Sequence, residues 1–244
     1  VILGLGDAEI AAFLTGATAN DLVDGPITTI TNNAPTQLPL GDTTVTFTAQ
    51  DNAGNFGSAQ ATISVKDLTP PTVTPPADIT LEATGVTTAV ALGTATASDL
   101  VSGVLNPTAD NIGPFAVGVH QIIWSATDAA QKTGSAIQTV TITDSTTPAL
   151  TLPANMTVEA TSATGAVISY SVSASDVVDG VITASCTPIS GSTFALGTTP
   201  VNCSATDSSN HTSSGSFSIS VVDTTAPQIS LIGNSLITIT VGDV

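Results

Sequence analysis

Short runs of alternating apolar and polar residues extend along most of the chain. Residues 45–49 (Val-Thr-Phe-Thr-Ala) and 122–126 (Ile-Ile-Trp-Ser-Ala) place apolar side chains at every second position. Gly, Pro, Asn or Asp interrupts this alternation about every 8–12 residues. Runs of period two that are rich in Thr, Val and Ile predict half-buried antiparallel strands. Only residues 8–14 carry a weak helical spacing, so the sequence predicts an all-β fold.

The strand pattern recurs with a period close to 78 residues. Asp51, Asp128 and Asp207 open equivalent turns and are 77 and 79 residues apart. Two further sets of aspartates keep the same step: Asp21, Asp99 and Asp176, and Asp67, Asp144 and Asp223. Several markers in register are the signature of tandem repeats.

About seven short strands in each repeat are typical of an immunoglobulin-like β-sandwich. We therefore predict such domains at residues 1–67, 68–144 and 145–223, and the first strands of a fourth, incomplete repeat at 224–244. Each closing aspartate is followed by a proline-containing linker, which would limit bending. The sequence thus predicts an elongated rod of tandem sandwiches, and its ends suggest a segment cut from a longer protein.

The charge of the chain is strongly one-sided. Nineteen carboxylates face two lysines, for a net charge of −17, while 41% of the residues are hydrophobic. The apolar content argues against disorder. Nucleic acids and anionic membranes are excluded as partners, because both require clustered basic residues.

Most carboxylates fall at equivalent positions near the linkers. We expect Glu82, Asp144, Asp176, Asp179 and Asp207 to gather around one linker, and Asp67, Asp99 and Asp128 around the preceding one. Such groups repel unless a cation lies among them, and hard oxygen ligands select Ca²⁺. The alternative is ordinary turn chemistry, in which each aspartate bonds backbone N–H groups. We keep both interpretations at this point, with an interdomain Ca²⁺ as the cofactor to be tested.

Two cysteines lie in the third repeat, 17 residues apart, on strands that we expect to be neighbours. A disulfide between Cys186 and Cys203 would stabilise the fold by roughly 3 kcal/mol and would indicate an oxidising, extracellular location. A pair of reduced, buried thiols is the alternative. Three sequons, at Asn155, Asn202 and Asn210, are candidate glycosylation sites in that setting.

Residues 186–207, which run from Cys186-Thr187-Pro188 through Phe194-Ala195-Leu196-Gly197 to Cys203-Ser204-Ala205-Thr206-Asp207, closely resemble the hyalin repeat. This family consists of immunoglobulin-like modules of extracellular adhesion proteins. The first two repeats resemble it more loosely, since Phe47 and Trp124 stand where the third repeat has Cys203. Residues 229–244 resemble a related bacterial immunoglobulin-like surface domain. The resemblance identifies a module and implies no enzymatic activity.

The sequence offers little support for catalysis. His120 and His211 have no nucleophile or metal-ligand spacing around them, and phosphate-binding, Cys-x-x-Cys and Gly-x-Ser-x-Gly motifs are missing. We therefore predict a non-catalytic structural segment of a secreted or cell-surface protein: an adhesin stalk, surface layer or filament whose partners are its own copies or other surface proteins. The alternatives are an accessory module array of a secreted hydrolase, or a filament subunit in which a strand at residues 1–14 completes a neighbour's sheet.

Overall fold

The computed structural model describes residues 3–4, 8–230, 232–233 and 241. The chain forms two compact units. The first contains the residues up to 80 together with 89–114 and 119–141, and the second contains 81–88, 115–118 and the residues from 142 onward. This division differs from the predicted boundaries of the repeats, which remain a prediction.

The predicted all-β class is confirmed, because every repeat is built from short strands that pair into small sheets. One helix, α1 (Ala8–Thr15), is present among the described residues. Three alanines give this segment high helix propensity, and Ile10 and Leu14 lie on one face, four residues apart. The expected donor strand at residues 1–14 is therefore wrong for residues 8–14, which are helical. Residues 1–2 and 5–7 lie outside the described part.

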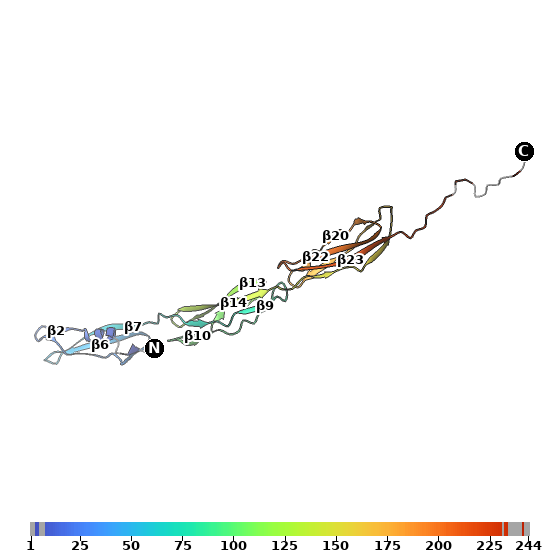
Figure 1. The fold of residues 1–244 in the computed structure, drawn as a ribbon. Helices are drawn as coiled ribbons and strands as arrows, with labels where there is room; N and C mark the ends of the chain where they lie inside the picture. Colours follow the sequence, from blue (N-terminus) through green and yellow to red (C-terminus); the bar gives the residue numbers. More distant parts are fainter. Residues whose placement is uncertain (1–2, 5–7, 231, 234–240, 242–244) are drawn as a thin grey trace. The chain divides into compact units, whose positions relative to one another are not determined.

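The second unit shows the sandwich most completely. Its strands after the linker at Asp144 are β15 (Ala149–Thr151), β16 (Met156–Glu159), β17 (Ala166–Ile168), β18 (Ser173–Asp176), β19 (Gly180–Ile182), β20 (Ser185–Thr187), β21 (Ser192–Phe194), β22 (Gly197–Thr206) and β23 (Thr212–Val222). They form the sheets β15-β18-β19 and β16-β23-β22-β20 and the pair β17-β21. In Figure 1 the long strands β22 and β23 run side by side.

The first strand of this sandwich contributes to both sheets. β15 pairs antiparallel with β18, whereas β16 pairs parallel with β23. The core between the sheets contains Val201, Cys203, Phe217 and Ile219, all less than 5% exposed. These residues alternate with exposed ones along β22 and with partly buried or exposed ones along β23, as the period-two pattern predicts.

The second repeat follows the same plan, and most of its residues belong to the first unit. Its strands are β8 (Thr72–Thr74), β9 (Ile79–Glu82), β10 (Thr96–Asp99), β11 (Gly103–Leu105), β12 (Thr108–Ala109), β13 (Gly118–Thr127) and β14 (Thr133–Thr143), in sheets ordered β11-β10-β8 and β12-β13-β14-β9. Trp124 is a core residue, as expected: its Nε1 donates to Oε1 of the fully buried Gln138 at 3.0 Å. The Gln138 amide in turn donates to the carbonyl oxygens of Ala77 and Leu92.

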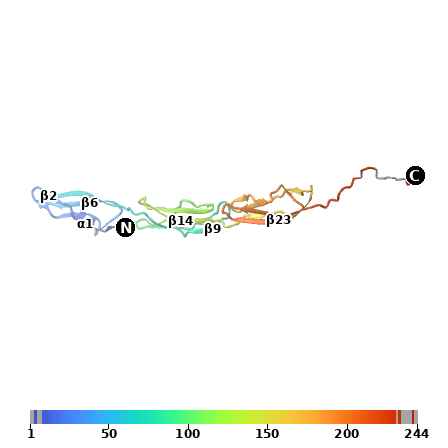
Figure 2. The ribbon, with the colours of Figure 1, turned by 45° about the horizontal axis from the view of Figure 1, so that its top comes forward.

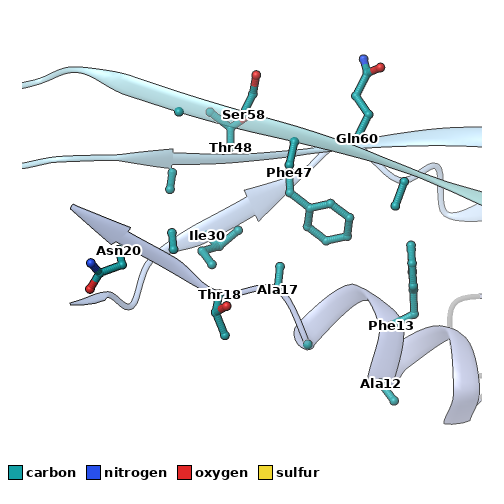
Figure 3. Close-up of a pocket in the computed structure, with 16 residues that line it drawn as sticks. Ala12, Phe13, Ala17, Thr18, Asn20, Ile30, Phe47, Thr48, Ser58 and Gln60 are labelled. Atoms are coloured by element: carbon teal, nitrogen blue, oxygen red, sulfur yellow. The ribbon is translucent and has the colours of Figure 1, made fainter. Parts of the chain in front are cut away.

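The first repeat departs from this plan at its beginning. Its strands are β1 (Leu3–Gly4), β2 (Ala19–Asp21), β3 (Gly25–Ile27), β4 (Ile30–Asn32), β5 (Gln37–Leu38), β6 (Gly41–Gln50) and β7 (Phe56–Val65). They form a three-stranded sheet, β4-β6-β7, and the pairs β2-β3 and β1-β5. Figures 1 and 2 show α1 beside this sheet, where the Phe13 ring packs edge-on against Phe47 with centroids 5.7 Å apart (Figure 3).

The predicted fourth repeat lies largely outside the described residues. Residues 224–230 are described and form no strand.

Candidate cation sites

Three kinds of aspartate, one from each repeated set, lie close together near the linkers that begin at Asp67 and Asp144. The first closes a hairpin: the Oδ1 atom of Asp99 accepts hydrogen bonds from the backbone N–H of Val101 and Ser102, and Asp176 accepts equivalent bonds from Val178 and Asp179. The N–H of Ser102 in particular lowers the pKa of Asp99, because it stabilises the charged form. This carboxylate is therefore ionised at neutral pH.

The second aspartate organises the loop between the two long strands. The Oδ1 atom of Asp128 accepts from the N–H of Lys132 at 2.8 Å, and Oδ1 of Asp207 accepts from the N–H of His211 at 2.7 Å. Both aspartates are nearly inaccessible to solvent, at 3% and 7% exposure. The loops after them require a left-handed residue, which is Gln131 in one and Asn210 in the other.

The third aspartate begins the linker. The Oδ1 atoms of Asp67 and Asp144 accept from the backbone N–H and the hydroxyl of Thr69 and Thr146, respectively. The Thr146 hydroxyl foremost lowers the pKa of Asp144, which is 8% exposed. That hydroxyl also lies 3.2 Å from Oδ2 of Asp176, so one proton serves two carboxylates.

Carboxylate groups from the three sets lie close together in each unit. In the first unit, the Asp128 cluster consists of Asp67, Asp99 and Asp128, each of which offers a carboxylate oxygen within 4.8 Å of the others. In the second unit, the Asp144 cluster comprises two overlapping groups with the same spacing: Asp144, Asp176 and Asp179, and Asp144, Asp207 and His211.

Several oxygen atoms in these clusters have no hydrogen-bond donor. Among the described residues, Oδ2 of Asp67, Asp128 and Asp207 are buried and lack a partner that donates a hydrogen bond. Turn chemistry explains the bonded Oδ1 atoms, but it leaves these Oδ2 atoms desolvated and unsatisfied, which is costly for an ionised group.

The first repeat shows how the same loop behaves when the second oxygen is satisfied. Asp51 accepts from the backbone N–H of Asn55 through Oδ1 and from the Asn55 side-chain amide through Oδ2, at 2.7 and 2.8 Å. Lys132 and His211 take the place of Asn55 in the other repeats, and their side chains make no such bond to the aspartate. The Oδ2 atoms of Asp128 and Asp207 therefore lack a donor because the fourth loop residue after each aspartate is no longer an asparagine.

His211 belongs to the Asp144 cluster, although no metal-ligand spacing surrounds it in the sequence. Its Nδ1 atom lies 3.3 Å from Oδ2 of Asp207, which is an ion pair when the imidazole is protonated, and the contact lacks the geometry of a hydrogen bond. The sequence signal that could have indicated this contact is the position of His211, four residues after Asp207, where the other repeats carry Asn55 and Lys132.

Two of the expected ligands have other contacts. The carboxylate of Asp179 accepts from the N–H and hydroxyl of Ser208 and thereby ties the hairpin to the loop. Glu82 lies outside the oxygen groups defined above: it accepts from the N–H of Ser145 at 2.6 Å and from the hydroxyl of Thr143. The Ser145 bond lowers the pKa of Glu82. Glu159 holds Thr224 and Thr225 at the next linker in the same way.

The disulfide prediction is confirmed. Cys186 and Cys203 are Cα partners on β20 and β22 and form the S–S bond, so neither thiol is free. The three sequon asparagines, Asn155, Asn202 and Asn210, are exposed, and their glycosylation stays a prediction. Within the described part of the chain, no helix is long and apolar enough to cross a membrane.

Two-sheet sandwiches in tandem, a cross-strand disulfide and acidic clusters at the linkers define the class of immunoglobulin-like extracellular modules. The chain belongs to the HYR domain (hyalin repeat) family, which matches residues 2–65 and 143–221. This confirms the resemblance and the extracellular location inferred from the cysteines.

Two proteins named hyalin are similar over nearly the whole chain. The protein from Strongylocentrotus purpuratus is 32% identical over 241 residues, which cover 92% of this chain and 20% of that protein. The protein from Lytechinus variegatus is 31% identical, with 95% and 46% covered. The chain thus spans less than half the length of these relatives.

Solved structures with a similar arrangement are cadherin repeats. A protocadherin gammaB7 EC3-6 structure covers 91% of this chain and 66% of its own, with 15% identity and a TM-score of 0.35. A mouse cadherin-23 EC22-24 structure covers 75% and 74%, with 14% identity and a TM-score of 0.33. Likeness at this level adds nothing to the assignment of the site.

Proposed function

We propose that the chain is a non-catalytic structural segment of a secreted or cell-surface adhesion protein, as in a stalk, surface layer or filament, and that Ca²⁺ bound at the Asp128 and Asp144 clusters stiffens its linkers. The observation that carries the proposal is the set of buried Oδ2 atoms of Asp67, Asp128 and Asp207, which have no hydrogen-bond donor. Its partners are other copies of the protein or other surface proteins.

The donor set favours calcium on chemical grounds. Calcium takes six to eight oxygen ligands at about 2.3–2.6 Å, so two ligands of one ion are at most about 5 Å apart. The carboxylate oxygens within each group lie within 4.8 Å of one another, which fits a single ion. In the Asp128 cluster all three residues supply oxygen, and water would complete the shell. Zinc prefers nitrogen and sulfur ligands, and only His211 in the Asp144 cluster offers one.

The position of the clusters suggests what the ion would do. Asp67 and Asp144 are linker residues, whereas Asp99, Asp128, Asp176 and Asp207 belong to the hairpins and loops of a sandwich. An ion that joins the two kinds of residue would fix the linker to that sandwich. A structural segment gains stiffness from such a bridge.

The test is thermal unfolding with calcium and with EDTA. We expect the melting temperature to fall in EDTA, because a ligand that binds only the folded state stabilises it by RT ln(1 + [L]/Kd), or about 2.7 kcal/mol at a concentration of 100 Kd. Asp128→Asn should lose this calcium response in the first unit. Asp110→Asn is the matched control, since Asp110 is exposed, lies outside both clusters and accepts one backbone bond that an Asn Oδ1 retains. A melting temperature that is the same in calcium and in EDTA would overturn the calcium part of the proposal.

A further inference from the structure

The loop that joins the two long strands has the same form in each repeat, but the fourth residue after its aspartate differs. The aspartate accepts, through Oδ1, the backbone N–H of the residue four positions later. The three pairs are Asp51 with Asn55, Asp128 with Lys132, and Asp207 with His211. An imidazole nitrogen is a ligand for zinc and other divalent transition metals, whereas calcium takes oxygen ligands. The third repeat therefore carries a type of ligand that the other two loops lack.

The ring nitrogen of His211 lies close to the unsatisfied oxygen of Asp207. Its Nδ1 atom is 3.3 Å from Oδ2 of Asp207, and both atoms are buried without a hydrogen bond. The side chain of Asp207 has no exposed surface, so this oxygen has neither a hydrogen-bond donor nor contact with solvent. Two ligands of a tetrahedral zinc ion, each about 2.0–2.2 Å from the metal, lie roughly 3.3–3.5 Å from one another. The observed separation therefore suits two ligands of one such ion.

Asp144 supplies a second carboxylate at the same place. The ligand atoms of Asp144, Asp207 and His211 lie within 4.8 Å of one another. Both carboxylates are held in position by hydrogen bonds. The hydroxyls of Thr146 and Ser209 donate to the two oxygens of Asp144 at 2.8 and 3.1 Å, and the backbone N–H of His211 donates to Oδ1 of Asp207 at 2.7 Å. Two anchored carboxylates and one imidazole thus form a preorganised set of ligands.

The Asp128 cluster provides a comparison within the same chain. It contains the linker residue Asp67 and the loop residue Asp128, whose carboxylate oxygens lie within the same distance of one another. At the position of His211 it has Lys132, whose ammonium group has no lone pair with which to bind a metal. The ligands of the Asp128 cluster are therefore oxygen atoms alone. The difference in ligand type between the two clusters depends on this one residue.

We propose that Asp144, Asp207 and His211 bind a divalent transition-metal ion, represented by zinc, and that the Asp128 cluster does not. Three protein ligands leave one position of a tetrahedral zinc ion for water. The ion would join a linker residue, Asp144, to the loop between β22 and β23. The inference concerns a cluster that we also propose for calcium, so the two ions would compete there. It rests on the ring nitrogen of His211, however, and does not require calcium.

Zinc titration of the 244-residue protein, measured by calorimetry after removal of metals and without calcium, tests this site. His211→Asn is the diagnostic variant. Asparagine keeps the backbone N–H bond of the loop, and in the first repeat Asn55 also donates through its side chain to Oδ2 of Asp51 at 2.8 Å, so the variant should fold. His120→Asn is the matched control, because His120 is the other histidine of the chain and lies on β13, outside both clusters.

We expect one zinc ion per chain. His211→Asn should weaken its binding by about tenfold or more, since even the outer-shell partners of a metal site contribute that much to its affinity, and His120→Asn should leave the affinity unchanged. Because the chain has two histidines, NMR signals of the imidazole rings report on each of them separately. Zinc should shift the signals of His211 and leave those of His120 in place. Lys132→His should add a second zinc site at the Asp128 cluster, because it supplies the missing nitrogen.

Absence of zinc binding, or binding that His211→Asn leaves unchanged, would overturn the proposal and leave the contact of His211 with Asp207 as an ion pair only. A stoichiometry that Lys132→His does not raise would contradict the role given to the nitrogen. The same titration in millimolar calcium separates the two metal proposals. Zinc binding that depends on His211 but does not weaken in calcium supports the zinc site and counts against calcium at this cluster. A melting temperature that responds to calcium, without any zinc binding, supports the calcium proposal and overturns this one.

Discussion

Replacement of Asp207 by asparagine separates the two interpretations of the acidic clusters. Asp207 is 7% exposed; its Oδ1 atom holds the loop through the N–H of His211, and its Oδ2 atom has no hydrogen-bond donor. Asparagine retains the carbonyl oxygen for the loop bond. Its side-chain NH₂ group takes the place of Oδ2 and can donate a hydrogen bond to Nδ1 of His211, which lies 3.3 Å from Oδ2 in the unmodified protein. The substitution therefore removes charge and a cation ligand while the turn is preserved.

The expected magnitude follows from the spacing of the carboxylates. The ligand atoms of Asp144 and Asp207 lie within 4.8 Å of one another, and two unit charges at that distance repel by about 3.5 kcal/mol at an effective dielectric constant of 20. In EDTA, Asp207→Asn should therefore be at least as stable as the unmodified protein. In calcium at 100 Kd, the unmodified protein should gain about 2.7 kcal/mol, or roughly 10 °C, and the variant less than about 1 kcal/mol.

The chain provides a separate optical reporter for each unit. Tyr170 is the only tyrosine, belongs to the second unit and packs against Phe217 with ring centroids 5.0 Å apart, so near-UV circular dichroism follows that core. Trp124 is the only tryptophan and follows the first unit by fluorescence. Asp207→Asn should change only the transition reported by tyrosine. If the variant lost the same stability in calcium and in EDTA, Asp207 would act through the turn alone and the cation argument would fail.

Three further outcomes are expected. Backbone N–H groups, that of Thr224 first, lower the pKa of Glu159. The stabilising contribution of Glu159 is therefore present above its ordinary pKa of about 4.5 and is lost as the pH falls through the folded-state value. In melting curves recorded from pH 7 to pH 3, Glu159→Gln should make the fall in melting temperature at acid pH smaller. Replacement of Cys186 and Cys203 by alanine should lower the free energy of unfolding by about 3 kcal/mol or more, measured by urea titration, and an unchanged midpoint would contradict the structural role of the bond. Gly134→Ala should cost about 1–3 kcal/mol, because the added Cβ atom would overlap the carbonyl oxygen of Pro71, whereas Gly57→Ala, with free space at its Cβ position, should cost less than about 0.5 kcal/mol; equal losses in the same titration would contradict this difference in packing.

The sequence alone predicts the architecture of the second and third repeats well, because a half-buried strand leaves a direct trace in a period-two pattern. Residues 201–205 alternate between buried and exposed positions as expected, and residues 217–221 alternate between buried and partly buried ones. The repeat spacing also predicts that the linker aspartates lie near those of the hairpins and loops, since equivalent positions in equivalent folds occupy equivalent places.

The sequence predicts less where neighbouring structure decides the outcome. Residues 8–15 have a weak helical pattern, and the helix is stabilised by packing of Ile10 on Leu38 and Val65, which no local signal reveals. The role of His211 depends on its distance from Asp144, a residue 67 positions earlier in the chain.

The central claim is that cations bind among the linker aspartates, and calcium binding to the whole 244-residue protein tests it most directly. Isothermal titration should show at least two sites per chain, with one lost in Asp128→Asn, another in Asp207→Asn and none in Asp110→Asn. Absence of binding at millimolar calcium, or binding that both cluster variants leave unchanged, would contradict the account.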